Sequence, residues 1–314
     1  MAILSKSSDL AALDVTVRTA FMDAYNSAQA SNWTMYATRQ QSSSDGNLYP
    51  FAVDAAVIRE WSEGERVING LVLSSRKVVN SKYELTYGIK REALDDDMSG
   101  AVRNLVSMLR AGGNKHANLP DKLCVSVITG NGTSLDGLAL FHASHKVAPN
   151  TASTATFANT ASGALTAANF AAARAAMMAL QAADGDPVNP NPGLLIVPPA
   201  LELTARQILE ADNLVYTAGD GATTNVYKGR ATVMVEPRLA AGFTGGSDSY
   251  WYLVDATSPE DRPVIFQERE AVEIASLFNP SDPNVFERDE YVWGTRRRCV
   301  AAAGNPKKIF RRTG

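Results

Sequence analysis

Apolar side chains recur every three or four residues in several stretches, a spacing that predicts helices. Residues 8–28 place five of them on one face: Leu10, Leu13, Val17, Phe21 and Ala24. The same spacing follows Asp97 from Val102 to Leu109, and a further helix is expected to start at Pro120, a good first-turn residue. Residues 164–183 are rich in strong helix formers, with Thr166 as the expected N-cap.

Other stretches have the composition of strands. Residues 66–91 read as a long β-ribbon, in which two apolar, β-branched runs flank a polar centre at 74–82. The second run alternates, so that Tyr83, Leu85, Tyr87 and Ile89 share one face. A ribbon of two strands is marginal alone in water, so we expect this one to lie against another surface.

The order of these elements decides the fold class. An apolar run at 194–202 and alternating segments at 231–239, 243–255, 263–277 and 289–304 predict further strands, with a short helix over 202–211. Helices thus come mostly before a series of strands, which favours α+β over a regular βαβ alternation.

Composition excludes several classes of protein. The 314 residues are 45% hydrophobic and carry a net charge of −3, so neither general binding to nucleic acid nor binding to a membrane surface is expected. No apolar run approaches the ~20 residues that span a bilayer, and the start lacks a signal peptide, so we expect a soluble protein made in a cytoplasm. Cys124 and Cys299 form no CxxC pair, and we expect both to be reduced and packed as small apolar residues.

Candidate catalytic and metal-binding residues are few. Asp95, Asp96 and Asp97 precede a predicted helix, where acidic residues complement its dipole; a divalent-metal cluster is the alternative. His142 and His145 would share a face if they lay on a helix, and two histidines could hold a metal, but no HExxH motif completes a zinc site. A structural turn is the favoured interpretation of this pair.

The remaining acidic pair is also expected to be structural. Glu268 and Glu270 lie two apart in a predicted strand, and we expect them on a solvated, salt-bridged surface. The residues themselves therefore predict no catalytic, cofactor-binding or metal site, and the chain is not expected to be an enzyme.

Three segments follow one another in a known order: GLALFHASHKV (137–147), ALTAANFAAARAAMMALQ (164–181) and PGLLIVPPALELTARQILEA (192–211). In this order they resemble the major capsid proteins of tailed bacteriophages, which have the HK97-like coat fold. A second set is similar to the major head subunit of Mu-like phages: REW (59–61), KYE (82–84), DDDMSGA (95–101), RPVIFQERE (262–270) and YVWGTRRRCVAAAG (291–304). The resemblance covers most of residues 55–304, and the order of the motifs carries it.

The resemblance implies a division of the chain by shape. It implies an N-terminal arm (1–57), an extended β-hairpin called the E-loop (58–91), a peripheral domain with a long spine helix (92–165), a mostly axial domain (166–255), and C-terminal strands that return to the peripheral domain and end in a basic tail (256–314). Gly112 and Gly113 depart from an unbroken spine helix, so a bend or an end is expected there.

The resemblance also implies a function without catalytic residues or cofactors. Copies would form hexamers and pentamers of an icosahedral shell around packaged double-stranded DNA, which the wall would contact non-specifically. Portal, scaffold or protease, and decoration proteins would be the other partners, and no membrane is involved. The protein would assemble in the host cytoplasm and end in the virion.

The ribbon would lie across a neighbouring subunit in such a shell. The residues expected at this contact are Val67, Leu71, Leu73, Lys77, Lys82, Tyr83, Leu85 and Tyr87. Lys77 or Lys82 occupies a place where some relatives form a Lys–Asn isopeptide bond, although the sequence indicates no acceptor asparagine.

Several alternatives stay open from the sequence. An encapsulin-like compartment shares the fold but encloses protein, a phage tail or tube protein is also built from β-ribbons, and a small-molecule enzyme would use His142 and His145. The basic tail, with Lys307, Lys308, Arg311 and Arg312, could face DNA, remain solvated or pair with a neighbouring subunit.

Overall fold

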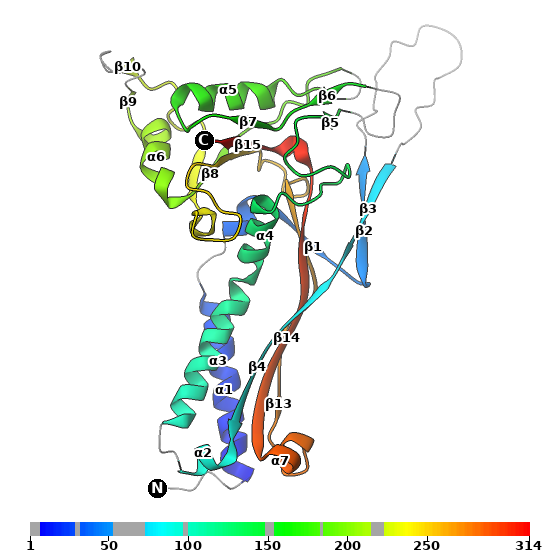
Figure 1. Cartoon of the computed structure of the whole chain (residues 1–314), viewed down its shortest axis with the longest axis vertical. Helices are drawn as coiled ribbons and strands as arrows, with labels where there is room; N and C mark the ends of the chain where they lie inside the picture. The colour runs from blue at the N-terminus through cyan, green and yellow to red at the C-terminus, as the bar shows by residue number, and fades with distance from the viewer. Residues whose placement is uncertain are drawn as a thin grey trace. The chain divides into compact units, whose positions relative to one another are not determined.

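The computed structural model describes residues 7–28, 32–52, 73–96, 100–147, 154–182, 185–214 and 223–314, which divide into two units (Figure 1). Unit 1 comprises Met1–Ser31, Asn80–Asp121 and Glu268–Val300, and unit 2 comprises Asn32–Val79, Lys122–Gln267 and Ala301–Gly314. The predicted domain boundaries differ from the boundaries of these two units, and they stay a prediction.

Unit 1 is built from helices and long strands. Its elements are α1 (Ser7–Ser27), β4 (Ser81–Lys90), α2 (Arg91–Asp96), α3 (Ala101–Ala117), α7 (Pro283–Arg288) and most of β13 (Val264–Leu277) and β14 (Glu290–Ala303). β4 pairs antiparallel with β14 along its whole length, and α1 lies beside α3 (Figure 1). The predicted apolar face of α1 is buried, and one core joins α1 to α3 and β14: Leu10, Leu13, Val17, Leu94, Leu105, Leu109, Val285, Tyr291 and Trp293.

The helix expected to bend at Gly112 and Gly113 is continuous from Ala101 to Ala117. A Cβ on Gly113 would lie 2.4 Å from the carbonyl oxygen of Phe21, and one on Gly112 would lie 2.7 Å from Cδ2 of Leu85. The two glycines therefore let α1 and β4 approach α3 closely, and packing outweighs their poor helix propensity. The expectation of a bend was wrong; the chain breaks instead at Asn118, and α4 (Leu119–Thr129) restarts with Pro120 in its first turn as predicted.

Asp95 and Asp96, which precede α3 in the sequence, do not complement its dipole. Asp95 and Asp96 end α2, where Asp95 lies 3.6 Å from Arg91, and the first turn of α3 contains no acidic residue. α3 begins only after Gly100, whose φ of 65° is left-handed. The expected helix-dipole role was therefore wrong for the two described carboxylates, and Asp97 lies outside the described residues.

Unit 2 centres on a mixed five-stranded sheet, whose strands lie in the order β11 (Thr232–Val235), β8 (Leu194–Val197), β12 (Trp251–Val254), β15 (Ile309–Thr313) and β7 (Thr160–Ser162). α5 packs on β15, and α6 packs on β8 and β11, around a core that includes Phe170, Trp251 and Phe310. The predicted cap of α5 is confirmed, since Thr166 Oγ1 accepts a 3.1 Å hydrogen bond from the Asn169 amide. None of the helices in the described ranges is long and apolar enough to cross a membrane.

The strands of unit 2 are β1 (Ala37–Gln41), β2 (Gly46–Ala52), β3 (Leu73–Val79), β5 (His145–Lys146), β6 (Thr156–Phe157), β7 (Thr160–Ser162), β8 (Leu194–Val197), β9 (Asn213–Leu214), β10 (Thr223–Thr224), β11 (Thr232–Val235), β12 (Trp251–Val254) and β15 (Ile309–Thr313). Its helical elements are η1 (Asn32–Met35), most of α4, α5 (Ala167–Met178), η2 (Pro199–Leu201), α6 (Glu202–Glu210), η3 (Pro237–Leu239) and η4 (Pro306–Lys308).

The basic C-terminal segment is part of the core sheet of unit 2. β15 lies between β12 and β7, Lys307 is buried, and Lys308 Nζ lies 2.9 Å from Asp255. Arg312 donates to the Ser162 carbonyl at 2.8 Å. Of the alternatives left open for this segment, a solvated tail is therefore excluded, because the adjacent Ile309 and Phe310 are both buried.

Candidate functional site

The predicted ribbon is formed by different strands from those expected. β3 pairs antiparallel with β2, from Gly46 opposite Val79 to Ala52 opposite Leu73, and β4 pairs with β14. The two runs within 66–91 are thus not partners of each other, and Asn80 links β3 directly to β4. The polar centre at 74–82 contains no glycine or proline that would favour a turn, and its serines, lysines and valines continue as strands.

The β2–β3 ribbon has one face held by its own unit and one open face. On the held face, Tyr49 Oη donates to Gln267 at 2.8 Å, and Gln267 Nε2 donates to the Val78 carbonyl at 3.2 Å. Burial raises the pKa of Tyr49. On the open face, Leu48 is 63% exposed and Val79 is 50% exposed. Two apolar side chains therefore stand in solvent beside Lys77, which is exposed as well.

Four of the eight predicted contact residues belong to the first run of 66–91. Val67 and Leu71 lie outside the described residues. Leu73 begins β3 opposite Ala52, and Lys77 lies opposite Leu48 on the open face, 3.8 Å from Asp45. Of these four, the structure places Leu73 and Lys77 on the β2–β3 ribbon.

The other four residues lie on β4, in unit 1. Leu85 Cδ2 approaches Gly112, and Tyr87 packs with Ile89 against the helical core, while Lys82 is exposed on the opposite face. Tyr83 is half-buried opposite Arg297, and burial raises its pKa. The predicted alternation of β4 is confirmed, but this strand finds apolar contacts within its own chain, which corrects the expectation that the whole ribbon depends on a neighbour. A role of the eight residues between subunits stays a prediction.

A buried ion pair that the sequence did not predict lies in the sheet of unit 1. Arg297 Nη2 lies 2.6 Å from Glu268 Oε1, and Arg297 Nη1 donates to the His116 carbonyl at 2.8 Å. Glu268 was expected on a solvated surface and is instead buried, whereas Glu270 forms 3.0 Å pairs with Arg296 and Arg298 as expected. The signal for Glu268 was the apolar run Val264–Phe266 just before it, which is typical of a strand buried on both faces.

The ring of His116 is buried beside this pair. Thr295 Oγ1 donates to the Leu85 carbonyl at 3.0 Å and lies 2.8 Å from His116 Nε2. Because the hydroxyl proton of Thr295 is already used, His116 Nε2 donates and its Nδ1 carries no proton. Burial, and then the positive charge of Arg297, lower the pKa of His116. The ring therefore sits as a neutral imidazole between helix and sheet.

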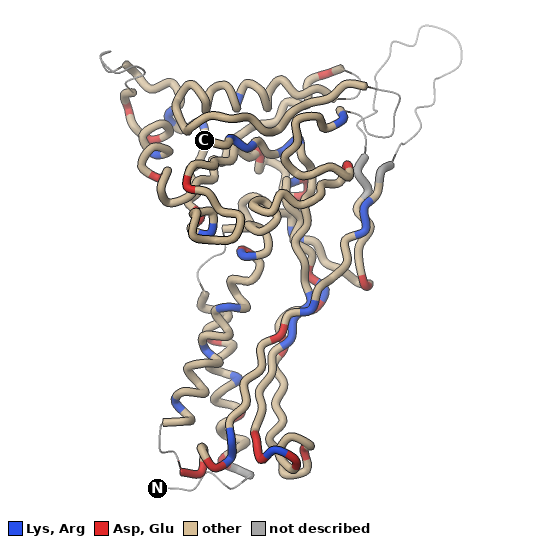
Figure 2. Tube along the Cα trace, viewed as in Figure 1, with Lys and Arg blue, Asp and Glu red and all other residues tan. Residues whose placement is uncertain are grey.

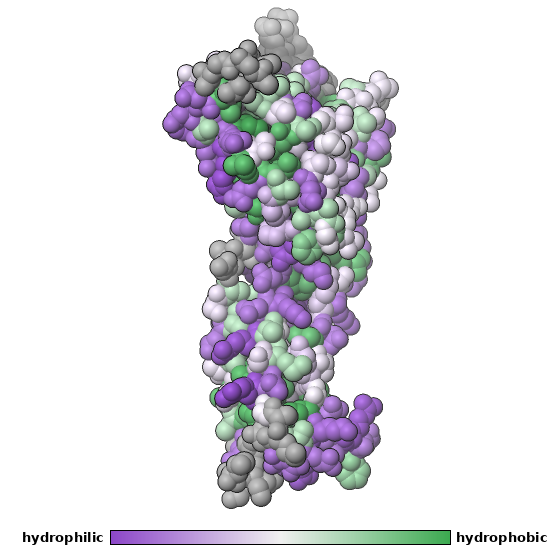
Figure 3. Space-filling view, turned by 60° about the vertical axis from the view of Figure 1, so that its left-hand side comes forward, coloured by the Kyte–Doolittle hydropathy of each residue, from purple (hydrophilic) through white to green (hydrophobic). Residues whose placement is uncertain are grey.

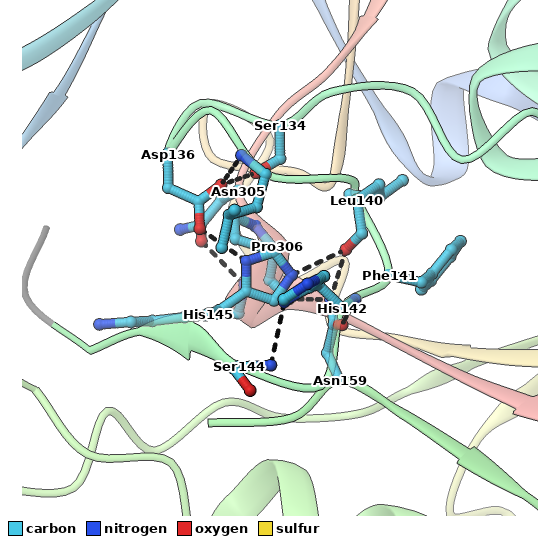
Figure 4. A network of polar contacts seen from close by, with 12 residues as sticks. Ser134, Asp136, Leu140, Phe141, His142, Ser144, His145, Asn159, Asn305 and Pro306 are labelled. Carbon is cyan, nitrogen blue, oxygen red and sulfur yellow. Dashed lines mark hydrogen bonds and ion pairs between the residues drawn. The ribbon is translucent and has the colours of Figure 1, made fainter. Parts of the chain in front are cut away.

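His142 and His145 lie in a loop and in β5, not on a helix (Figure 4). His145 Nδ1 lies 2.6 Å from Asp136 Oδ2, and His145 Nε2 lies 3.2 Å from the Leu140 carbonyl. Burial alone would raise the pKa of Asp136, but the hydrogen bonds from His145 and Ser134 outweigh it and lower that pKa. Both ring nitrogens of His145 are thus occupied by protein groups, which leaves neither available as a metal ligand.

Asn159 ties this loop to the C-terminal segment. Its Nδ2 donates to the Leu140 carbonyl at 2.7 Å and to the Pro306 carbonyl at 3.1 Å, and its Oδ1 accepts from the His142 amide at 2.9 Å (Figure 4). Within the described ranges, no three His, Cys, Asp or Glu residues gather as metal ligands. The network therefore supports the structural interpretation of the histidine pair.

Cys124 and Cys299 are both buried and form no disulfide bond, as expected. Burial raises the pKa of Cys299 to about 11, so its thiol is protonated at neutral pH. Such a thiol is a poor nucleophile.

Comparison with known proteins gives a consistent result. The family model of the Mu-like prophage major head subunit gpT matches residues 10–164, 160–239 and 236–312. No curated protein matches the sequence.

Several similar solved structures are phage capsids. The procapsid of bacteriophage JBD30 is 22% identical with a TM-score of 0.53, over 98% of this chain and 76% of that chain. The mature capsid of bacteriophage PhiM1 is 13% identical with a TM-score of 0.52, over 90% and 87%. The capsid of cyanophage P-SCSP1u is 10% identical with a TM-score of 0.53, over 91% and 88%.

At these identities the structures show a shared fold, which confirms the predicted HK97-like coat fold. The family match adds function, because it extends over almost the whole sequence. The chain therefore belongs to the Mu-like prophage major head subunit family.

Proposed function

We propose that this major head subunit assembles as rings of five and six copies into a closed icosahedral shell that holds double-stranded DNA. The observation that carries the proposal is the open face of the β2–β3 ribbon, with Leu48 and Val79 in solvent. The family match supports the wall of a phage head rather than a compartment that encloses protein cargo, or a tail tube.

The ribbon has two features of an incomplete surface. β2 and β3 form a two-stranded sheet, so their outer edges offer backbone groups for pairing. Its open face presents apolar area that a neighbour would remove from water, at roughly 25 cal/mol per Å² buried. Leu73 and Lys77 belong to the same ribbon and would contact the neighbour with it.

A contact of this kind is head-to-tail, because the ribbon of one copy meets a different surface of the next. Such contacts close into rings when the rotation allows. Each subunit is then held by several neighbours at once, so modest individual contacts still produce a durable wall. The wall would form in the host cytoplasm and join portal, scaffold or protease, and decoration proteins; one similar structure is a JBD30 capsid decorated with minor capsid protein trimers.

Electron microscopy of the expressed full chain tests the proposal. Wild type should form closed shells, and Leu48→Asp/Val79→Asp should leave unassembled subunits, because charge on the open face opposes burial. The matched control is Leu48→Val/Val79→Ile, which keeps the same positions apolar and should assemble. Circular dichroism of each variant should match wild type, since both positions are exposed.

Two results would count against the proposal. Tubes or stable monomers from wild type would contradict the shell itself. Normal shells from the aspartate variant would contradict the role of the ribbon and leave the shell to other surfaces.

A further inference from the structure

Every charged side chain on the outward face of α3 is positive. The exposed residues of this helix include Arg103, Arg110 and Lys115, and its sequence contains no aspartate or glutamate. Figure 2 shows lysine and arginine along α3 without any acidic residue, and Figure 3 shows hydrophilic side chains interspersed with apolar ones on this side of the molecule. The opposite face of α3 is the buried one that packs on α1 and β4.

These cations also lack partners. Among the residues that the structure describes, none pairs with Arg103, Arg110 or Lys115, either by an ion pair or by a side-chain hydrogen bond. A solvated helix usually mixes both signs, because Glu and Lys four residues apart stabilise it. α6 of the same chain does so, with Arg206 between Glu202 and Glu210. A positive, unpaired face in a chain of net charge −3 therefore gives up local stabilisation.

The spacing of the three residues suits an extended polyanion. Arg103 and Arg110 are about two turns apart, or about 10.5 Å along the axis, on the same side of the helix; Lys115 lies about 7.5 Å further along and about 140° round it, at the flank of the exposed side. Double-stranded DNA presents about one phosphate per 1.7 Å of its axis, so a face of this length meets phosphates wherever it lies along the duplex. The polar side chains between the cations, Ser107 and Asn114, are hydrogen-bonding groups that contact phosphate or water equally well.

We propose that the outward face of α3, with Arg103, Arg110 and Lys115, binds the phosphate backbone of the packaged double-stranded DNA and therefore faces the interior of the shell. This inference rests on the proposed function. It assigns a direction to unit 1, with the helical layer toward the DNA and the outer face of the sheet away from it. Each of these contacts is independent of the DNA sequence, and three contacts per copy add little affinity. The DNA can therefore slide along the wall.

The test uses the unassembled full chain and a fluorescently labelled DNA duplex, with binding measured by anisotropy over a series of salt concentrations. The helix variant is Arg103→Gln/Arg110→Gln/Lys115→Gln. The control is Arg230→Gln/Arg288→Gln/Lys90→Gln, which removes the same number of exposed arginines and lysines elsewhere. The slope of log affinity against log salt should become shallower by about 2–3 in the helix variant, at roughly 0.9 per phosphate contact, and should stay unchanged in the control.

Three results would overturn the inference: no binding by wild type, equal losses in both variants, or a loss confined to the control. Poly-glutamate in place of the duplex separates a second possibility, since a helix variant that loses poly-glutamate but keeps DNA would assign the face to an acidic polypeptide. Electron microscopy of wild type and both variants under assembly conditions keeps the two proposals apart. If wild type forms shells but the helix variant binds DNA as wild type does, this inference is wrong and the proposed shell still stands.

Discussion

In unit 1 the arginines of β14 pair with carboxylates of β13, whereas α3 leaves its own cations in solvent. Arg296 and Arg298 reach Glu270, and Arg297 reaches Glu268 inside the unit. On α3, Arg110 has no partner among the described residues. Paired charges of the first kind fix strands relative to one another, and unpaired charges of the second kind remain available to a ligand. Substitutions in the two layers should therefore change different properties.

The largest expected effect is on stability, in the sheet. Arg297→Met leaves Glu268 buried without its cation and should lower the free energy of unfolding by about 3–5 kcal/mol. Urea denaturation of the full chain measures it. Arg110→Gln, on the exposed face of α3, should change the same quantity by no more than about 0.5 kcal/mol.

The double variant Arg297→Met/Glu268→Met is the internal control. It removes both charges and should recover most of the loss, because two apolar side chains replace the pair. If Arg297→Met cost no more than Arg110→Gln, the contrast between the two layers would fail.

Sequence patterns identified the faces of these layers but not their partners. The spacing of Leu10, Leu13 and Val17 located α1 and its buried side, and alternation located the inward face of β4. Periodicity predicts which residues share a face, but it does not predict which other strand pairs with that strand. The partner of β4 is β14, about 200 positions later, so the expected pairing of the two runs of 66–91 with each other was wrong.

Local rules also failed where packing or loop geometry decided the outcome. Gly112 and Gly113 weaken an isolated helix, yet here they are the places where Leu85 and Phe21 approach. The spacing of His142 and His145 has meaning only on a helix, and the chain forms a loop there. The open face of the β2–β3 ribbon was not predicted from the sequence either, because β2 was not recognised as the partner of β3.

An intermediate effect is expected where the helical layer itself is packed. Gly113→Ala gains up to about 1 kcal/mol of helix propensity. Its Cβ would lie 2.4 Å from the Phe21 carbonyl oxygen, and overpacking of this kind costs about 1–3 kcal/mol. Thermal denaturation should therefore show a lower midpoint. Ser107→Ala, on the exposed face of the same helix, should leave the midpoint unchanged or raise it slightly, and a stabilised Gly113→Ala would show that α1 can move away from α3 at no cost.

The smallest effect is a dependence on pH where the two layers meet. His116 faces Thr295 and Arg297 of β14 and the ring of Phe21 on α1, whose centroid is 6.0 Å away. Its pKa is lowered in the folded chain, so below about 6.5, its ordinary value, the unfolded chain takes up a proton that the folded chain does not. The free energy of unfolding should then fall as the pH falls, by up to about 1.4 kcal/mol per pH unit, until the folded ring is protonated too.

His116→Gln isolates this contribution. A glutamine amide can still donate to Thr295 Oγ1 but does not titrate, so the variant should lose less stability than wild type between about pH 7 and pH 5. Asp136 and Asp255, whose pKa values are lowered, keep their contribution above their ordinary value of 3.8 and lose it only below, so they do not enter this window. Parallel curves for wild type and His116→Gln would mean that the ring gains a proton in the folded chain as easily as in the unfolded one, and that Arg297 does not oppose its charge across the boundary between helix and sheet.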